Sequence, residues 1–172
     1  WRGWGGRGAG GGAGRLVAGL MPAHGGLDVV MGEKVPLFGG TTAYSAGVIW
    51  IPMSEACVAA GIADSAAEAL RYLESEVDTF LDRPKAEAFV ANAAQMLAFF
   101  ERETPVRYLL MPAWSDYHPE LPGASQGGRP LLPLPYAGPQ LGDPSATLRA
   151  PARKGVGGGR VGGPEGRQSP SK

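Results

Sequence analysis

Residues 32–52, GEKVPLFGGTTAYSAGVIWIP, decide the predicted fold because they follow residues 27–31, a short apolar run that is typical of a buried parallel strand. This strand ends in an acid, Glu33, and a turn then leads into residues 39–42, GGTT. Small residues and hydroxyl groups let the backbone approach a ligand closely and offer donors to an anion. An acid at a strand end, followed by such a segment, indicates a dinucleotide held at its ribose and its pyrophosphate.

A glycine-rich tract, residues 8–14, stands upstream of this strand. Gly10 and Gly12 fit the first two positions of the Gly-x-Gly-x-x-Gly fingerprint, which opens a helix and precedes an acid by roughly 20 residues. Gly10 lies 23 residues before Glu33, so the spacing supports a dinucleotide site. The other interpretation is that a glycine-rich tract matches any glycine motif by chance.

The third position of the fingerprint is occupied by Arg15. A glycine there normally lets the helix pack closely on the strand, so we expect Arg15 to push apart the strand and the helix, which runs to about His24. A second register, Gly8, Gly10 and Ala13, satisfies the pattern but places the acid slightly later. Both registers stay open.

The stretch GLDVVMGEKVPLFGGTTAYSAGVIWIP, residues 26–52, resembles the adenine-side FAD segment of a flavoprotein family. That family includes 3-oxosteroid Δ1-dehydrogenases and fumarate reductase flavoprotein subunits. The steroid dehydrogenase branch is also similar to residues 115–123 (SDYHPELPG), 127–131 (GGRPL) and 141–149 (LGDPSATLR). The resemblance runs from about residue 10 to residue 151, and family members are several times longer than this chain.

The resemblance implies an α/β fold: an incomplete Rossmann-like FAD-binding domain over residues 10–151, with following helices and the start of a substrate cleft. The implied cofactor is FAD. The cofactor-binding residues would be Gly10, Gly12, Gly14, Glu33, Lys34, Gly39, Gly40, Thr41, Thr42, Ser45 and Gly47. The implied reaction is hydride transfer from a ketosteroid-like substrate to the flavin, which an external electron acceptor then reoxidises.

In the same resemblance, Tyr117 stands where the family has an active-site tyrosine. That tyrosine assists a second, downstream tyrosine, which takes a proton from the ring carbon beside the carbonyl. A phenol with a pKa of about 10 needs hydrogen-bonding help to act as a base near pH 7. The downstream partner is absent from this sequence, so we expect an incomplete and inactive portion of such an enzyme, or of another fumarate reductase-type flavoprotein.

The two ends differ from the middle in composition and charge. Glycine and proline, 28 and 16 residues, concentrate there, and residues 16–148 carry a net charge of −8 that the basic ends balance. Residues 1–9, WRGWGGRGA, stand where the family requires a first strand but contain no β-branched residue. We therefore predict that this strand is missing, that residues 1–9 and 152–172 are disordered, and that the strand at residues 27–31 has an unpaired edge.

Arginine and glycine in the ends could instead contact nucleic acid through charge and stacking. We favour the interpretation of disordered ends joined to an enzyme segment, because neither end repeats a regular RGG unit. The sequence shows no apolar run long enough to span a bilayer and no signal peptide, so we expect a cytoplasmic protein. Its one cysteine, Cys57, excludes an internal disulfide framework and a cysteine metal cluster, and we expect a buried, inert thiol.

The middle of the chain predicts two helices and a strand. Ser65 and Glu68 have capping-box spacing and open the first helix, whose apolar residues extend to Phe80. The second helix begins near residues 82–83, with Pro84 in its first turn, and runs to about residue 103. Its expected buried stripe consists of Phe89, Ala93, Met96, Leu97 and Phe100.

A strand at residues 106–111 precedes a loop at residues 112–139, where prolines and glycines predict no regular element. The loop contains His118, whose ordinary pKa would suit a general base; we favour a surface histidine in a polar turn. The acids Glu74, Glu76, Asp78, Glu101 and Glu103 are expected on a solvated face.

Overall fold

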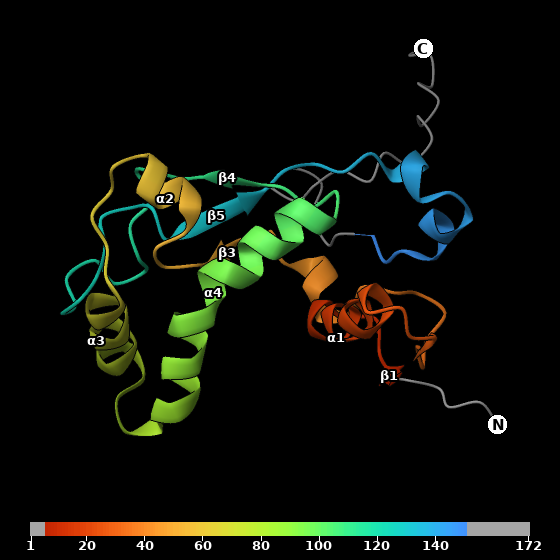
Figure 1. Ribbon diagram of the computed structural model, residues 1–172, viewed down its shortest axis with the longest axis horizontal. Helices are drawn as coiled ribbons and strands as arrows, with labels where there is room; N and C mark the ends of the chain where they lie inside the picture. The colour runs from red at the N-terminus through yellow and green to blue at the C-terminus, as the bar shows by residue number, and fades with distance from the viewer. Residues whose placement is uncertain (1–5, 151–172) are drawn as a thin grey trace, which may run out of the picture. The chain divides into compact units, whose positions relative to one another are not determined.

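The structure is a computed structural model that describes residues 6–150 (Figure 1). The described chain forms two compact units. The first comprises the residues up to Gly47 together with those from Pro135 onward, and the second is Val48–Leu134. Of the two ends predicted to be disordered, residues 1–5 and 152–172 lie outside the described residues.

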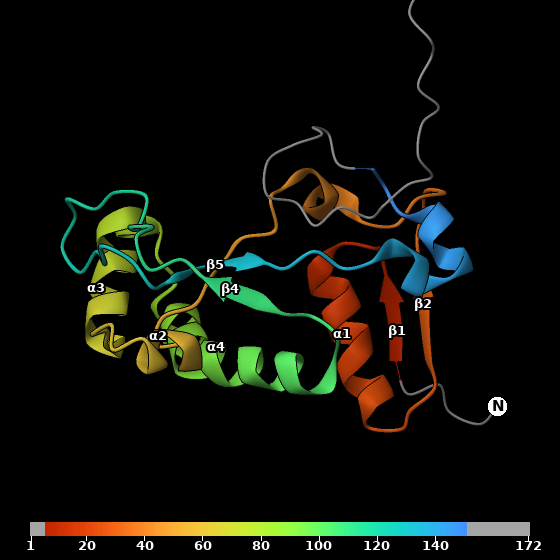
Figure 2. The same ribbon diagram turned by 90° about the horizontal axis from the view of Figure 1, so that it is seen from above.

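The first unit is built on a strand–helix–strand arrangement: β1 (Gly6–Ala9), α1 (Ala13–His24) and β2 (Val29–Gly32). The two strands are parallel, with Gly6 opposite Val29 and Ala9 opposite Gly32. Figure 2 shows α1 lying alongside both strands. The predicted helix to His24 and a parallel strand before Glu33 are confirmed, but the prediction that this strand is buried is wrong, because Leu27 is 51% exposed and Val30 is 43% exposed.

The prediction that the first strand is missing is wrong for Gly6–Ala9. A strand is held by backbone hydrogen bonds, so a run without β-branched residues can join the ladder when a neighbouring strand offers its N–H and C=O groups. The pairing continues past the strand end, where the Gly10 N–H donates to the Gly32 carbonyl at 2.5 Å. The edge of β2 that was predicted to be unpaired is therefore paired with β1.

The expectation that Arg15 separates the helix from the sheet is also wrong. Its side chain is exposed and lies over Gly10, where an added Cβ would come within 2.8 Å of the guanidinium. The close approach occurs one turn later, at the buried Gly19, where a Cβ would lie 2.5 Å from the Met31 Sδ atom. The helix therefore packs tightly on β2 through a glycine that the fingerprint does not include.

The first unit is completed by three short 3₁₀ helices, Gly40–Tyr44, Gly138–Leu141 and Asp143–Thr147. The last of these leads into a parallel bridge between Leu148 and Phe38. In this bridge the Phe38 N–H donates to the Thr147 carbonyl and the Arg149 N–H donates to the Phe38 carbonyl, both at 2.8 Å. The end of the described chain is thus fastened beside the stretch that precedes Gly39.

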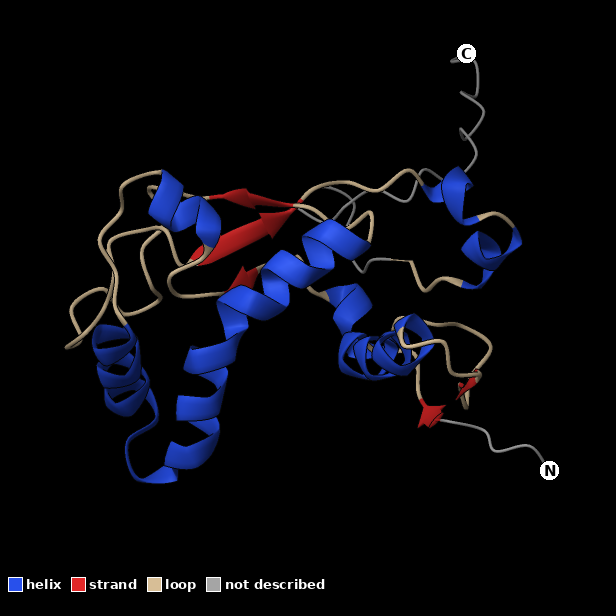
Figure 3. Cartoon of the chain, viewed as in Figure 1, coloured by secondary structure: helices blue, strands red, loops and turns tan. Residues whose placement is uncertain are grey.

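The second unit contains the helices α2 (Glu55–Ala59), α3 (Ala66–Val77) and α4 (Arg83–Glu103), shown in blue in Figure 3. Each begins at a side-chain cap: the oxygens of Ser54, Ser65 and Asp82 accept hydrogen bonds from backbone N–H groups three residues later. The predicted starts of α3 and α4 are confirmed. Within the described residues, no helix is both long enough and apolar enough to cross a membrane.

A three-stranded antiparallel sheet packs against α4 in the order β3 (Ile49–Trp50), β5 (Pro130–Pro133), β4 (Tyr108–Leu110). The core cluster consists of Ile51, Ala93, Leu97 and Leu131. The predicted stripe of α4 is confirmed for Ala93, Leu97 and Phe100, which are buried, whereas Phe89 and Met96 are about 40% exposed and Phe80, beyond α3, is 91% exposed.

The strand β5 corrects the prediction that residues 112–139 contain no regular element. Its two prolines stand at its ends, where a missing N–H costs little, and Leu131 and Leu132 lie between them. Leu131 is only 1% exposed and pairs with both Ile49 and Leu110. The strand is stabilised by burial between two neighbours, which the local sequence does not show.

The prediction that Cys57 is buried is confirmed. The Cys57 side chain is fully buried, and burial raises the pKa of its thiol. Gly128 lies directly against it, because an added Cβ there would come within 3.0 Å of the Cys57 Sγ atom. The thiol is therefore packed and largely protonated at neutral pH.

Candidate cofactor-binding site

The loop between β1 and α1 consists of Gly10, Gly11 and Gly12. Gly10 has a φ of +106°, a conformation that side chains other than glycine rarely adopt. Gly12 is the N-cap residue of α1 and has no side chain with which to cap the helix. The amino end of a helix carries a partial positive charge and attracts anions.

Glu33 directly follows β2, and its carboxylate turns toward this loop. It accepts a hydrogen bond from the Gly11 N–H at 2.5 Å and a longer one, at 3.3 Å, from the Val35 N–H. The Gly11 hydrogen bond is the main cause that lowers the pKa of Glu33, so the side chain is ionised at neutral pH. The structure thus brings together the acid and the glycine tract that the sequence proposed as partners.

The GGTT segment packs on the same helix end. Gly39 and Gly40 have φ values of +119° and +52°, and the Gly39 N–H donates to the Gly11 carbonyl at 2.9 Å. A Cβ on Gly40 would lie 3.3 Å from the Gly12 Cα atom. The Thr42 hydroxyl oxygen accepts a hydrogen bond from the Ala13 N–H at 3.3 Å. The contact therefore favours glycine at position 40, whereas a Cβ on Gly12 would make only an ordinary contact, 3.9 Å from the Thr42 hydroxyl oxygen.

The remaining predicted residues take different places. Ser45 builds a turn: its hydroxyl donates to the Thr42 carbonyl at 2.8 Å and accepts from the Gly47 N–H at 3.1 Å. Thr41 and Lys34 are exposed. Gly14 is also exposed, and a Cβ there would meet nothing within 4 Å, so the packing of the helix does not require a glycine at this position.

Arg149 is a residue of this site that sequence reasoning missed. Its Cβ lies 3.4 Å from the position that a Cβ on Gly39 would take. Its Nη1 donates to the Tyr44 hydroxyl at 2.9 Å, and the guanidinium lies over the Tyr44 ring at 5.6 Å. The contact joins residues 105 positions apart, so no local pattern could reveal it.

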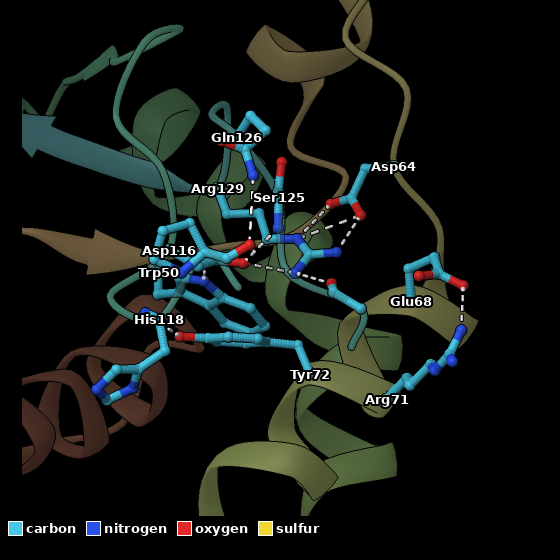
Figure 4. A network of polar contacts seen from close by, with 12 residues as sticks. Trp50, Asp64, Glu68, Arg71, Tyr72, Asp116, His118, Ser125, Gln126 and Arg129 are labelled. Atoms are coloured by element: carbon cyan, nitrogen blue, oxygen red, sulfur yellow. Dashed lines mark hydrogen bonds and ion pairs between the residues drawn. The ribbon is translucent and has the colours of Figure 1, made fainter. Parts of the chain in front are cut away.

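The second unit contains a buried polar network centred on Arg129 (Figure 4). Arg129 is 1% exposed, and its guanidinium pairs with Asp64 at 2.7 Å and with Asp116 at 2.8 Å. Asp116 also accepts a hydrogen bond from the Trp50 indole N–H at 2.7 Å, and Arg129 donates to the Gly123 carbonyl at 2.9 Å. The network fixes the two ends of the loop segment that carries Tyr117.

Tyr117 projects from this segment with 96% of its side chain exposed. Its neighbour His118 is held by α3: His118 Nδ1 lies 2.7 Å from a Glu76 oxygen, which also accepts a hydrogen bond from the Tyr72 hydroxyl. The interaction with Glu76 raises the pKa of His118. Burial, followed by the same carboxylate, raises the pKa of Tyr72 to about 12. Glu76 is thus engaged, contrary to its assignment to a solvated face.

Residues 9–165 match the family described as FAD binding domain. The 3-oxosteroid 1-dehydrogenase of Mycobacterium tuberculosis is 38% identical over 139 residues, which cover 81% of this chain and 25% of the relative. The 4-oxocyclohex-2-ene-1-carboxylate 5-dehydrogenase of Sinomonas cyclohexanicum is 39% identical over 134 residues, or 78% and 22% of the two chains.

Among solved structures, the chain is similar to 3-ketosteroid Δ1-dehydrogenase from Sterolibacterium denitrificans in complex with 1,4-androstadiene-3,17-dione. The TM-score is 0.78 at 33% sequence identity, and the match covers 84% of this chain and 26% of that one. The chain therefore spans about a quarter of the length of the relatives that it matches.

Proposed function

The chain belongs to the family of FAD-binding domains, and we propose that it forms the adenine-side half of the FAD site of a dehydrogenase that acts on cyclic ketones. The observation that carries this proposal is the hydrogen bond from the Gly11 N–H to the Glu33 carboxylate. It joins the first turn of a parallel strand–helix–strand unit to the acid that follows the second strand. This arrangement supports the assignment of a Rossmann-like nucleotide site.

The residues present fit the adenosine and pyrophosphate parts of FAD. Glu33 is ionised and stands where a carboxylate can accept the ribose hydroxyls. The N-cap residue of α1, Gly12, has no side chain, and the facing glycines Gly12 and Gly40 leave no side chain between the two backbones. In this proposal, Thr41, Thr42 and the turn at Ser45 and Gly47 would extend this cradle along the bound cofactor, and Gly10 and Lys34 would lie beside Glu33.

FAD, when bound, supplies an acceptor for two electrons in the form of a hydride. The named relatives act on oxosteroids and on oxocyclohexene carboxylates, which share a ketone on a six-membered ring. We therefore propose that the whole protein removes two hydrogens from adjacent ring carbons. The carbon beside the carbonyl loses a proton, its neighbour loses a hydride, and a carbon–carbon double bond forms. An external acceptor of two electrons completes the cycle.

Tyr117 is the residue of this chain that we assign to the substrate. Its phenol is exposed, while the Arg129–Asp116 pair and the His118–Glu76 contact hold the backbone on both sides. An exposed hydroxyl on a fixed segment is available to a substrate or to a second tyrosine from the remainder of the protein. Its role is to hydrogen-bond the phenol that takes the proton.

The alternative within the same family is a fumarate reductase-type flavoprotein, and the two differ in their substrates. The full-length protein loaded with FAD should be mixed with a 3-ketosteroid, a 4-oxocyclohexanecarboxylate or fumarate, and the reduction state of the flavin followed by absorbance. Bleaching by either ketone supports the proposal, whereas reoxidation of reduced flavin by fumarate alone supports the alternative. The cytoplasmic location stays a prediction.

The cofactor part of the proposal is tested on this chain itself. Titration of the purified chain with FAD should change the flavin fluorescence and saturate at one equivalent. Riboflavin, which lacks the adenosine and the pyrophosphate, should bind far more weakly, because the described cradle fits those two groups. Equal binding of FAD and riboflavin, or binding of neither, would overturn the assignment.

A further inference from the structure

Arg149 carries the one buried side-chain nitrogen or oxygen atom in the described part of the chain that lacks a hydrogen-bond partner, its Nε. Buried polar groups are nearly always paired, and an orphaned one calls for an explanation such as a missing ligand. The Nη1 atom of the same guanidinium is already used by the Tyr44 hydroxyl. The Nε–H group therefore calls for an acceptor that the described residues do not supply.

Among the described residues, no carboxylate pairs with the charge of Arg149. The ion pairs found among residues 6–150 do not include it. The segment on which it packs cannot supply a counter-charge, because residues 35–54 contain no acidic or basic side chain. A guanidinium that is partly buried without a carboxylate favours an anionic ligand with oxygen acceptors, such as a phosphate.

Arg149 is held next to the glycine cradle by its backbone as well as by its side chain. Its N–H donates to the Phe38 carbonyl, and its Cβ packs on Gly39. Gly40, the next residue, contacts Gly12 at the start of α1. One side of the GGTT segment thus faces the helix N-terminus, and the Cβ of Arg149 packs on its first glycine, with the guanidinium next to Tyr44.

We propose that Arg149 is a further cofactor-binding residue whose guanidinium neutralises the pyrophosphate of FAD; this rests on the proposed function. The amino end of α1 supplies only a partial positive charge, and the Thr42 hydroxyl already accepts its first N–H, whereas a diphosphate carries two full negative charges. Arg149 supplies a full positive charge from a segment 116 positions after Glu33. The site is therefore completed by the part of the chain that returns to the first unit after Leu134.

The test compares the affinity of the full chain for FAD in Arg149→Gln, Arg149→Lys and a matched control, Arg71→Gln, which removes an exposed arginine of the second unit. We expect Arg149→Gln to weaken FAD binding by about 10- to 100-fold, the range for a lost charged hydrogen bond. Arg149→Lys should restore part of the affinity because it keeps the charge. The control should bind as the parent does.

Two further readouts separate ligand binding from a structural role. The dependence of FAD affinity on salt should become less steep in Arg149→Gln, because one charge contact is lost. The melting temperature of the cofactor-free variant should stay close to that of the parent. If Arg149→Gln lowers the melting temperature and leaves the salt dependence of FAD affinity unchanged, the inference is overturned. Arg149 would then have a structural role through its contact with Tyr44.

The outcomes also distinguish this inference from the proposed function. If Glu33→Gln weakens FAD binding and Arg149→Gln does not, the inference fails and the FAD site stands. If the parent chain does not bind FAD at all, both are rejected.

Discussion

The carboxylate of Glu33 accepts a hydrogen bond from the backbone N–H of Gly11, and the two residues are 22 positions apart in the sequence. This contact ties the end of β2 to the turn that opens α1. Because the Gly11 carbonyl also accepts the Gly39 N–H, one glycine joins the acid, the helix start and the GGTT segment. The proposed FAD cradle depends on these three elements meeting at Gly11.

Gly40 and Gly14 make a matched pair for testing the cradle. Gly40→Val should lower the free energy of unfolding by about 1–3 kcal/mol, because a branched side chain at φ +52° is strained and would crowd Gly12. Gly14→Ala should leave it unchanged or raise it by up to about 1 kcal/mol, since alanine favours a helix and the site is open. Urea unfolding measures both. Equal stability of the two variants would show that the Gly12–Gly40 contact is loose.

Breaking the buried network should lower the free energy of unfolding by several kilocalories per mole. Asp116→Ala leaves Arg129 buried without one of its two carboxylates, so we expect a loss of about 3–5 kcal/mol in the free energy of unfolding. Glu120→Ala, on the exposed part of the same loop, should change it by less than about 0.5 kcal/mol. A loss below about 1 kcal/mol for Asp116→Ala would mean that water replaces the lost partner.

The His118–Glu76 pair predicts a pH dependence. The neighbouring carboxylates of Glu76 and Glu120 raise the pKa of His118, so the stability from this pair is fully present below the unfolded-state pKa of about 6.5. It is lost as the pH rises through the higher folded-state pKa. An NMR titration of the imidazole should show the raised pKa in the parent and a value nearer 6.5 in Glu76→Gln. A parent value at or below 6.5 would show that the pair does not form in solution.

Tyr117→Phe should separate catalysis from folding. The side chain is 96% exposed, so the stability of this chain should not change. In the full-length protein, flavin content should hold while turnover of a ketone substrate falls by about 10²- to 10⁴-fold, the range for a group that assists proton transfer. Turnover at the parent rate would make Tyr117 a surface residue.

Local signals predicted much of the fold correctly. The caps at Ser65 and Asp82 and the apolar run before Glu33 each act within a few residues, so the sequence alone reveals them. The strands β1 and β5 escaped prediction because their stability comes from partners far along the chain. A glycine-rich strand and a strand bounded by prolines both lack the side-chain pattern that indicates a strand.

In the candidate site, too, some contacts could be predicted from the sequence and others could not. The pairing of Glu33 with the glycine tract follows from a spacing rule, and the structure brings the two together. Arg149 and the Asp64–Arg129–Asp116 network depend on contacts between residues at least 13 positions apart, and as many as 105. Single charged residues at such separations give no periodic signal, so only the folded chain reveals them.

The central claim is that Glu33 binds the adenosine ribose of FAD, and its most direct test is the FAD affinity of Glu33→Gln. Glutamine keeps the size of the side chain but removes its charge, so the dissociation constant should rise by about 10- to 100-fold. Asp28→Asn removes an exposed charge just before β2 and serves as the control, with an unchanged dissociation constant. Flavin fluorescence titration gives all three values. If Glu33→Gln binds FAD as tightly as the parent and Asp28→Asn do, Glu33 does not hold the cofactor and the account is contradicted.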